Sequence, residues 1–409
     1  MSQRLHLFDA YGIELEYMIV DKSTLAVKPI SDELLKRVTG IYTGDFENGL
    51  VTWSNELVLH VIELKCTLPE ADLIQLEKGF SENVRRVNEL LAGWNAMLLP
   101  SAAHPFMNPY AETKLWPHDN NEVYKIYDTI FDCKGHGWSN LQSMHINLPF
   151  SGDEEFARLH TAIRIVLPLL PALCASSPYL DGATTGYADS RLTFYKSNQA
   201  KIPSITGDVI PEPVFSEAEH KRVILDRIEN DIAPYNVDDV LDPVWVNSRG
   251  AMSRFDRGSI EIRVMDIQEC PAADLAIATL VIATLKALIK ETWSSFSEQK
   301  KVPSEHLTPL LEASIKSGHR TLIENKTLLQ LFGESKEMTA QALWQKIAAR
   351  LGREALGNYQ ETIAFILDHG TLSHRILKAT NSSSSPEKIR DVYFQLSNCL
   401  ANNQLFKPS

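Results

Sequence analysis

The stretch GSIEIRVMD, residues 258–266, decides the fold class of this chain. Its aliphatic residues alternate with other residues, which is the pattern of a half-buried β-strand. The aliphatic side chains would point to one face of the strand, while Glu261 and Arg263 would point to the other. A simple salt bridge would account for this pair. The alternative is a binding site, in which the carboxylate holds a cation and the guanidinium binds phosphate oxygens with two nitrogens.

Two other stretches alternate in the same way and carry polar side chains on one face. Residues 5–20 predict a strand in which Glu14 and Glu16 share a face. The segment MHINL predicts a short strand with His145 and Asn147 on one face and the aliphatic residues on the other. Neighbouring carboxylates repel each other unless the face is wet or a cation lies between them. A solvated strand face is therefore the alternative to a metal site.

Residues 50–65 predict more β-structure and carry another acidic pair, Glu56 and Glu63. Glu63 lies in the aliphatic run VIEL, where an unpaired carboxylate would be costly to desolvate. Because seven residues separate the pair, a regular strand would place the two side chains on opposite faces. A bulge or bend is therefore required if both serve one site.

Helical periodicity dominates most of the remaining chain. Residues 178–213 are rich in Gly, Ser, Thr and Pro, and they predict a long irregular connection of the kind that is often functional. Strands alternate irregularly with helices, so we expect an α+β fold with an antiparallel or mixed sheet rather than a βαβ series. A short strand is expected at residues 98–103. Helices are expected at residues 69–98, 121–132, 153–174, 216–232, 272–296, most of 304–378, and 386–402.

Composition narrows the function classes. Of the 409 residues, 40 are Lys or Arg and 52 are Asp or Glu, and the net charge of −12 argues against nucleic-acid binding. Residues 1–10 contain no apolar signal segment, and the apolar stretch 163–175 is too short and too interrupted to span a membrane. Five widely spaced cysteines suggest neither zinc nor disulfides, so we expect a cytoplasmic protein. Without a Walker A or GxGxxG loop, a bound nucleotide would need metals and arginines.

Five segments, in this order, resemble those of the family-2 glutamate–cysteine ligases, also called carboxylate–amine ligases. They are GIELE at 12–16, AHPF at 103–106, ASSPY at 175–179 followed by Ser190-Arg191, GSIEIRVMD at 258–266, and DHGTL at 368–372. The resemblance runs from about residue 8 to about residue 380. The chain departs from the family in two places. The carboxylate–amine branch usually has HxH where this chain has an HxN similar to that of glutamine synthetases, and the Glu56–Glu63 spacing is longer than usual.

The resemblance implies a glutamine-synthetase-like fold, in which a curved, mostly antiparallel sheet forms a funnel with helices packed outside. It implies a single catalytic domain over residues 1–380, and a polar break and C-terminal helix would occupy residues 381–409. The implied activity is ATP-dependent joining of a carboxylate to an amine, as in glutathione biosynthesis. The product would be a γ-glutamyl amide made through an acyl phosphate, with release of ADP and phosphate.

The resemblance also implies roles for individual residues. Arg263 would contact the γ-phosphate of ATP, with His145 and Asn147 beside the nucleotide. Arg191 would bind the α-carboxylate of glutamate or the transferring phosphate. Two or three Mg²⁺ ions, or Mn²⁺ in their place, would be held by Glu14, Glu16, Glu56, Glu63, His145 and Glu261.

The implied substrates are small molecules, namely glutamate or a related carboxylate and an amine such as cysteine, and the chain would form a homo-oligomer or act alone. One alternative is a non-catalytic relative that binds ATP or an amino acid as a sensor or scaffold. Another is a ligase that acts on a different acid or on a peptide. A metal-dependent hydrolase is disfavoured, because His-rich and Asp-rich ligand sets are missing.

Overall fold

The structure is a computed structural model that describes residues 4–119, 121–236 and 239–408. Its centre is an eight-stranded sheet in the order β2-β3-β4-β1-β6-β10-β9, with β5 also paired to β1. Every pairing in this sheet is antiparallel, which confirms the expected α+β class. The strands are β1 Gly12–Asp21, β2 Asp45–Asn48, β3 Val51–Asn55, β4 Val61–Cys66, β5 Ala96–Leu99, β6 Ser143–Pro149, β9 Ala251–Arg254 and β10 Ser259–Asp266.

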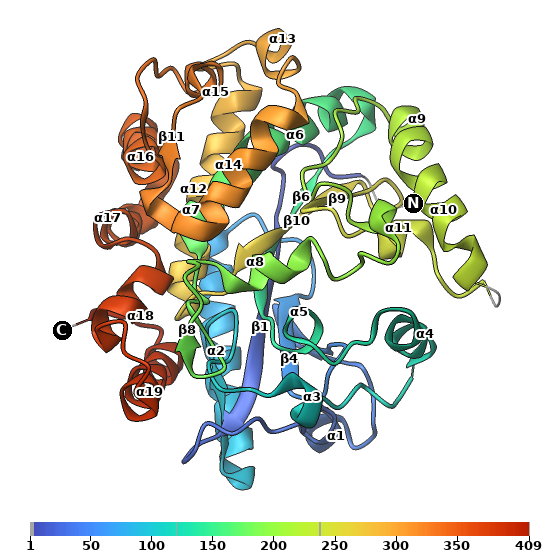
Figure 1. Cartoon of the computed structure of the whole chain (residues 1–409), viewed down its shortest axis with the longest axis vertical. Helices are drawn as coiled ribbons and strands as arrows, with labels where there is room; N and C mark the ends of the chain where they lie inside the picture. Colours follow the sequence, from blue (N-terminus) through green and yellow to red (C-terminus); the bar gives the residue numbers. More distant parts are fainter. Residues whose placement is uncertain (1–3, 120, 237–238, 409) are drawn as a thin grey trace.

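Helices surround the sheet (Figure 1). In that view α12, α14, α16 and α17 gather on the left, whereas α4, α9, α10 and α11 lie on the right. The C-terminus lies beside α18 at the left edge. The main helices are α1 Ser31–Thr39, α2 Leu73–Leu91, α4 Asn121–Phe131, α6 Gly152–Val166, α8 Ser190–Tyr195, α9 Glu217–His220, α10 Asp226–Ile232, α11 Pro243–Val246, α12 Pro271–Ile289, α14 Ser304–Ser317, α16 Ala340–Leu356, α17 Gln360–His369, α18 Leu372–Thr380 and α19 Pro386–Asn402.

Helix α12 is the central helix of the core. Within the described residues it is the one helix long and apolar enough to cross a membrane, with a mean hydropathy of 1.9, but 78% of that window is buried inside the protein. A helix that is apolar on every side needs neighbours on every side. Helices α2, α6, α16 and α17 all pack against α12.

The two faces of β1 have different neighbours. Ile13, Leu15 and Tyr17 are fully buried in the large core that also contains α2 and α12. On the opposite face, Met18 and Val20 belong to a second apolar cluster built mainly by α18 and α19. Helices α18 and α19 therefore cover one end of this second face, and the acidic residues Glu14 and Glu16 lie towards its other end.

Several predicted element boundaries are wrong, for local reasons. Strand β1 begins at Gly12 instead of residue 5, and the predicted helix 69–98 begins only where Asp72 caps it. The predicted single helix 153–174 ends at Val166 and continues as a short 3₁₀ turn and a four-residue helix. Pro168 and Pro171 account for the break, because proline lacks the N–H that a helix interior requires.

Further boundaries differ less. The strand expected at 98–103 lies at Ala96–Leu99, and the helix expected at 272–296 ends at Ile289. The predicted irregular connection 178–213 contains only short elements: two two-residue strands, the six-residue helix α8 and a three-residue 3₁₀ turn. The predictions for β10 and α19 are confirmed.

Candidate active site

Strand pairing brings the predicted site residues together. Glu16 of β1 lies opposite Glu63 of β4, and Glu14 lies opposite His145 of β6. Next along the sheet, Asn147 of β6 lies opposite Glu261 of β10. Residues that are directly opposite in adjacent strands share a face. Four neighbouring strands therefore present their polar side chains on the same face.

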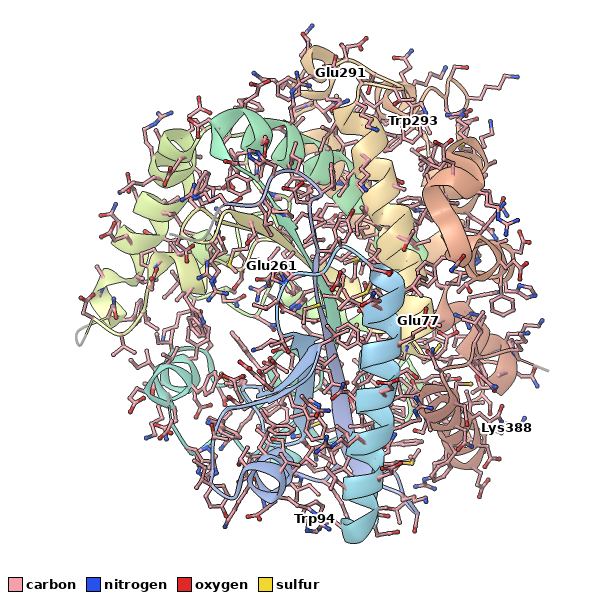
Figure 2. All side chains as sticks on the ribbon, turned by 180° about the vertical axis from the view of Figure 1, so that it is seen from behind. Glu77, Trp94, Glu261, Glu291, Trp293 and Lys388 are labelled. Carbon is pink, nitrogen blue, oxygen red and sulfur yellow. The ribbon has the colours of Figure 1, made fainter. Side chains whose placement is uncertain are left out.

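This face forms the floor of a cavity of about 1450 Å³. Figure 2, seen from behind the view of Figure 1, labels Glu261 near the middle of the molecule. All nine predicted residues line the cavity: Glu14, Glu16, Glu56, Glu63, His145, Asn147, Arg191, Glu261 and Arg263. The structure therefore supports their predicted proximity and leaves their roles to be tested.

The two members of the second acidic pair meet without a bulge. Strand β3 ends at Asn55 and β4 begins at Val61, so Glu56 lies in the reversal between two strands. Oxygen atoms of Glu16, Glu56 and Glu63 all lie within 4.8 Å of one another. The bend that the spacing required is therefore present, as the reversal of a β-hairpin, and no bulge is needed.

A second group of candidate ligands overlaps the first. Ligand atoms of Glu14, Glu63 and His145 also lie within 4.8 Å of one another. The His145 Nδ1 atom is 2.8 Å from Glu14 Oε2, and the Asn147 amide donates to the other oxygen of Glu14 at 2.8 Å. A Cβ atom at Gly12 would lie only 2.9 Å from the Asn147 Cβ, so the glycine of GIELE leaves room for this amide.

The cluster holds more negative charge than its neighbours balance. Burial and the charge of Glu16 raise the pKa of Glu56 to about 8, and burial with the charge of Glu14 raises the pKa of Glu63 well above its usual value. Burial would also raise the pKa of Glu14, but the hydrogen bond with His145 and the charges of His145 and Lys65 together lower that pKa to about 2. Lys65, 3.1 Å from Glu63, is the nearby lysine.

This donor set fits a hard divalent cation. Carboxylate oxygens and a single imidazole, gathered where carboxylates repel one another, match the preference of Mg²⁺ for oxygen ligands. Several bound positive charges would relieve the repulsion that raises the pKa of Glu56 and Glu63. A purely solvated strand face is excluded, because Glu16, Glu63 and Glu261 are all at most 9% exposed.

Glu261 and Arg263 form an ion pair with a distance of 2.9 Å between Nε and Oε1. Glu261 also lies 3.7 Å from His145 Nδ1, so it joins the polar floor rather than pairing with Arg263 alone. Burial would lower the pKa of Arg263, but the charge of Glu261 raises it, so the guanidinium stays charged. Glu261 and Arg263 can therefore form a salt bridge and belong to a binding site at the same time.

Arg191 is held by a partner that the sequence reasoning missed. Its Nε donates to Asp266 Oδ1 at 2.6 Å, and the backbone of Ser176 and the hydroxyl of Ser177 donate to the other oxygen of Asp266. Within the described part of the chain, the buried Arg191 Nη2 has no hydrogen-bond partner. Ser176 and Ser177 belong to the quoted segment ASSPY, and Asp266 belongs to RVMD. Nothing in the sequence indicates that these two segments contact each other.

Ser143 is a second residue that the sequence reasoning missed. Its backbone N–H and its hydroxyl lie 2.7 and 2.9 Å from Glu16 Oε2, and its Oγ lies 2.9 Å from His145 Nε2. Serine at the first position of β6 therefore orients two candidate ligands at once. Its place two residues before His145 was the available signal, because residues i and i+2 share a face.

Comparison with known proteins agrees with this arrangement. Residues 10–394 match the family described as Glutamate-cysteine ligase family 2 (GCS2). The chain belongs to this ligase family. One relative, named "Uncharacterized protein", comes from Archaeoglobus fulgidus and is 34% identical over 395 residues, which cover 97% of this chain and 99% of that one. Another, named "Putative glutamate--cysteine ligase 2-3", comes from Rubrobacter xylanophilus and is 26% identical, covering 66% of this chain and 67% of that one.

A solved structure shares the fold. The crystal structure of the glutamate–cysteine ligase of Francisella tularensis in complex with AMP matches 98% of this chain and 90% of that one, with a TM-score of 0.62. Sequence identity is 12%, so the likeness shows the fold. The expected fold of glutamate–cysteine ligases is thereby confirmed.

Proposed function

We propose that this family member is an active ATP-dependent carboxylate–amine ligase. It would make an amide through an acyl phosphate and release ADP and phosphate. The observation that carries the proposal is one cavity that brings the nine predicted residues together, among them five glutamates, a histidine and two arginines. A sensor or scaffold would not need this concentration of repelling charge, which lowers the stability of the folded chain unless cations bind.

Mg²⁺ is the group that the acidic cluster fits. Glu14, Glu16, Glu56, Glu63, His145 and Glu261 are the residues that would hold two or three such ions. When bound, the ions supply positive charge that lets an anionic carboxylate approach an anionic phosphate. Mn²⁺ would be able to replace Mg²⁺ in this role, because it also accepts oxygen and imidazole ligands.

The two arginines suit the two anionic substrates. Arg263 points its guanidinium into the cavity beside Glu261, where it would stabilise the transferring phosphoryl group. Arg191 is fixed by Asp266 and keeps Nη2 without a partner among the described residues, so it would bind the α-carboxylate of the acid. Asn147 and His145 would lie beside the nucleotide. The AMP bound to the Francisella enzyme supports a nucleotide site in this fold.

The proposed chemistry balances without a redox partner. A carboxylate oxygen attacks the γ-phosphorus of ATP, the bond to the bridging oxygen breaks, and ADP leaves. The amine nitrogen then attacks the acyl carbon, the bond to the phosphate oxygen breaks, phosphate leaves, and the nitrogen loses a proton. Because phosphoryl transfer depends mainly on positioning and electrostatics, fixed arginines and carboxylates are what it requires. We propose glutamate as the acid.

An ADP-release assay with glutamate, Mg-ATP and a panel of amines tests the proposal. We expect Glu261→Gln to lower turnover by about 10²–10³-fold, because it removes a buried charge from the phosphate-facing floor. Circular dichroism should show a retained fold, and the exposed Glu312→Gln serves as the matched control. Release of AMP and pyrophosphate would contradict the acyl-phosphate route. ATP binding without turnover of any amine would favour the sensor or scaffold.

A further inference from the structure

The cavity has two unlike ends, defined by the strands of its floor. At one end Gly12 of β1 lies opposite Asn147, and Ser259 of β10 lies opposite Pro149. At the other end Ser143 donates to Glu16 and lies opposite Asp266, which holds Arg191. The inference below rests on the proposed ligase function and concerns the second end.

The Gly12 end is rich in arginine. Arg4, Arg254 and Arg257 all line the cavity there, next to Gly258 and Ser259. Arg254 is paired with Asp256, and Arg257 has an exposed side chain. A polyphosphate needs positive charge along its length. This end therefore suits the nucleotide, whose γ-phosphate would reach the middle of the floor at Arg263.

Five aromatic side chains line the cavity, and we call them the aromatic wall: Tyr124, Tyr127, Trp138, Tyr195 and Trp245. Tyr127 contacts both tryptophans edge to face, with centroid distances of 5.7 Å to Trp138 and 5.2 Å to Trp245. Trp245 is 42% exposed, so part of its ring is open to a ligand.

The aromatic wall lies beside the acidic cluster. The Tyr124 hydroxyl accepts a hydrogen bond from the Asn55 amide, and Asn55 immediately precedes Glu56 in the chain. The wall also lies near the arginines: burial raises the pKa of Tyr195, and the charges of Arg263 and Arg191 oppose that rise. A molecule against this wall would thus lie next to the carbonyl carbon of an acid bound at Arg191.

This end offers no spare cation in the described part of the chain. Among the residues that line the cavity, the cations here are Arg191, Arg263 and Lys65. Each already has an acidic partner, respectively Asp266, Glu261 and Glu63. In the proposed reaction Arg191 and Arg263 also serve the acid and the phosphoryl group. The Mg²⁺ ions proposed at the acidic cluster would be balanced by its carboxylates and by the phosphates. An acceptor that carried its own carboxylate would therefore bring an anion without a counter-charge from the protein into a mostly aromatic pocket, which is costly.

We propose that the acceptor is an amine without a carboxylate, such as an alkyl, aryl or diamine, and that the aromatic wall binds it. Aromatic faces stabilise an ammonium or an apolar chain equally well, through the ring quadrupole and through buried area. Cysteine and other α-amino acids would be poor acceptors. The residues that line this end of the cavity would thus determine which amine the ligase accepts.

Matched acceptor pairs test this inference in the ADP-release assay. Cysteamine is compared with cysteine, phenethylamine with phenylalanine, and putrescine with ornithine, so that members of each pair differ only by a carboxylate. We expect kcat/KM to be at least about tenfold higher for the amine without the carboxylate in every pair that turns over. A preference for the amino acids would overturn the inference while leaving the ligase proposal standing. No acceptor-dependent ADP release with any member of the three pairs would overturn both.

A wall variant provides a second readout. Trp245→Leu should raise the KM for the preferred amine by about tenfold and leave the KM for ATP within about twofold. Tyr110→Leu removes an aromatic ring that is 73% exposed and does not line the cavity, so it is the matched control. A rise confined to the KM for ATP would assign the wall to the nucleotide base and overturn the inference.

Discussion

Two groups of buried charges in this protein behave in opposite ways. Glu269 and Arg375, just after β10 and in α18, form a pair in which two guanidinium nitrogens meet two carboxylate oxygens. The Phe406 backbone completes it, because its N–H donates to Glu269 and its carbonyl accepts from Arg375. The acidic cluster at Glu16, Glu56 and Glu63 instead gathers like charges in one place. A balanced pair stabilises the fold, whereas an unbalanced cluster of carboxylates suits the binding of cations.

The largest expected effect is on the balanced pair. Arg375→Leu should lower the free energy of unfolding by about 3–5 kcal/mol, because it leaves the Glu269 carboxylate buried without its partner. Urea unfolding of the variant and the parent measures this difference in the free energy of unfolding. The double variant Arg375→Leu/Glu269→Leu should recover most of the loss, and a single variant as stable as the parent would show that the pair is dispensable.

Arg191 stands between the two groups, since it is paired with Asp266 and also faces the cavity. Arg191→Lys keeps a charge but loses the two-nitrogen fork, so we expect kcat/KM for the acid to fall about 100-fold, or about 2.7 kcal/mol. The KM for ATP should change little. Steady-state kinetics against each substrate separates the two, and Arg85→Lys on the exposed face of α2 is the control. Equal losses for both substrates would contradict a role in binding the acid.

A substitution in the acidic cluster should change the stability in the opposite direction, that is, it should stabilise the folded protein. Without added metal, Glu63→Gln should raise the free energy of unfolding at pH 7 by about 1 kcal/mol, because it removes a buried carboxylate whose pKa is raised by burial and by Glu14. The same variant should lose the increase in Tm that Mg²⁺ gives the parent. Thermal melts with EDTA measure the change in stability without metal, and melts with Mg²⁺ measure the metal-dependent increase in Tm. A destabilised variant that keeps its Mg²⁺ response would remove Glu63 from the site.

The effect that is smallest at neutral pH concerns the buried histidines outside the cluster. Burial lowers the pKa of His60, His104 and His220 to about 4. The unfolded chain binds protons at these groups below about pH 6.5, while the folded chain does so only near pH 4, so stability should fall as the pH drops through this window. Each histidine contributes up to about 1.4 kcal/mol per pH unit.

Urea unfolding of the metal-free protein at several pH values between 7 and 4.5 measures this slope. His60→Gln, compared with the parent, should show a shallower fall of stability with pH. Identical slopes would mean that His60 takes up its proton as readily in the folded chain as in the unfolded chain. The cluster would act against this slope, because protonation of Glu56 and Glu63 relieves their repulsion.

The sequence by itself determined the parts of the site that depend on local periodicity. Glu14 with Glu16, His145 with Asn147, and Glu261 with Arg263 each share a face, because side chains two residues apart in a strand point the same way. The quoted segments also determined the family, as the match over residues 10–394 shows.

Only the tertiary structure decided how these faces combine. The register of four strands gathers the carboxylates, and the reversal after Asn55 brings Glu56 to Glu63 across a gap that strand periodicity had assigned to opposite faces. The ion pair of Arg191 with Asp266 joins residues that are 75 positions apart, and the aromatic wall joins α4, α5 (His136–Ser139), α8 and α11. The physical reason is that pairing and packing between distant segments depend on the whole core, whereas the direction of a side chain along one strand is set by its own backbone.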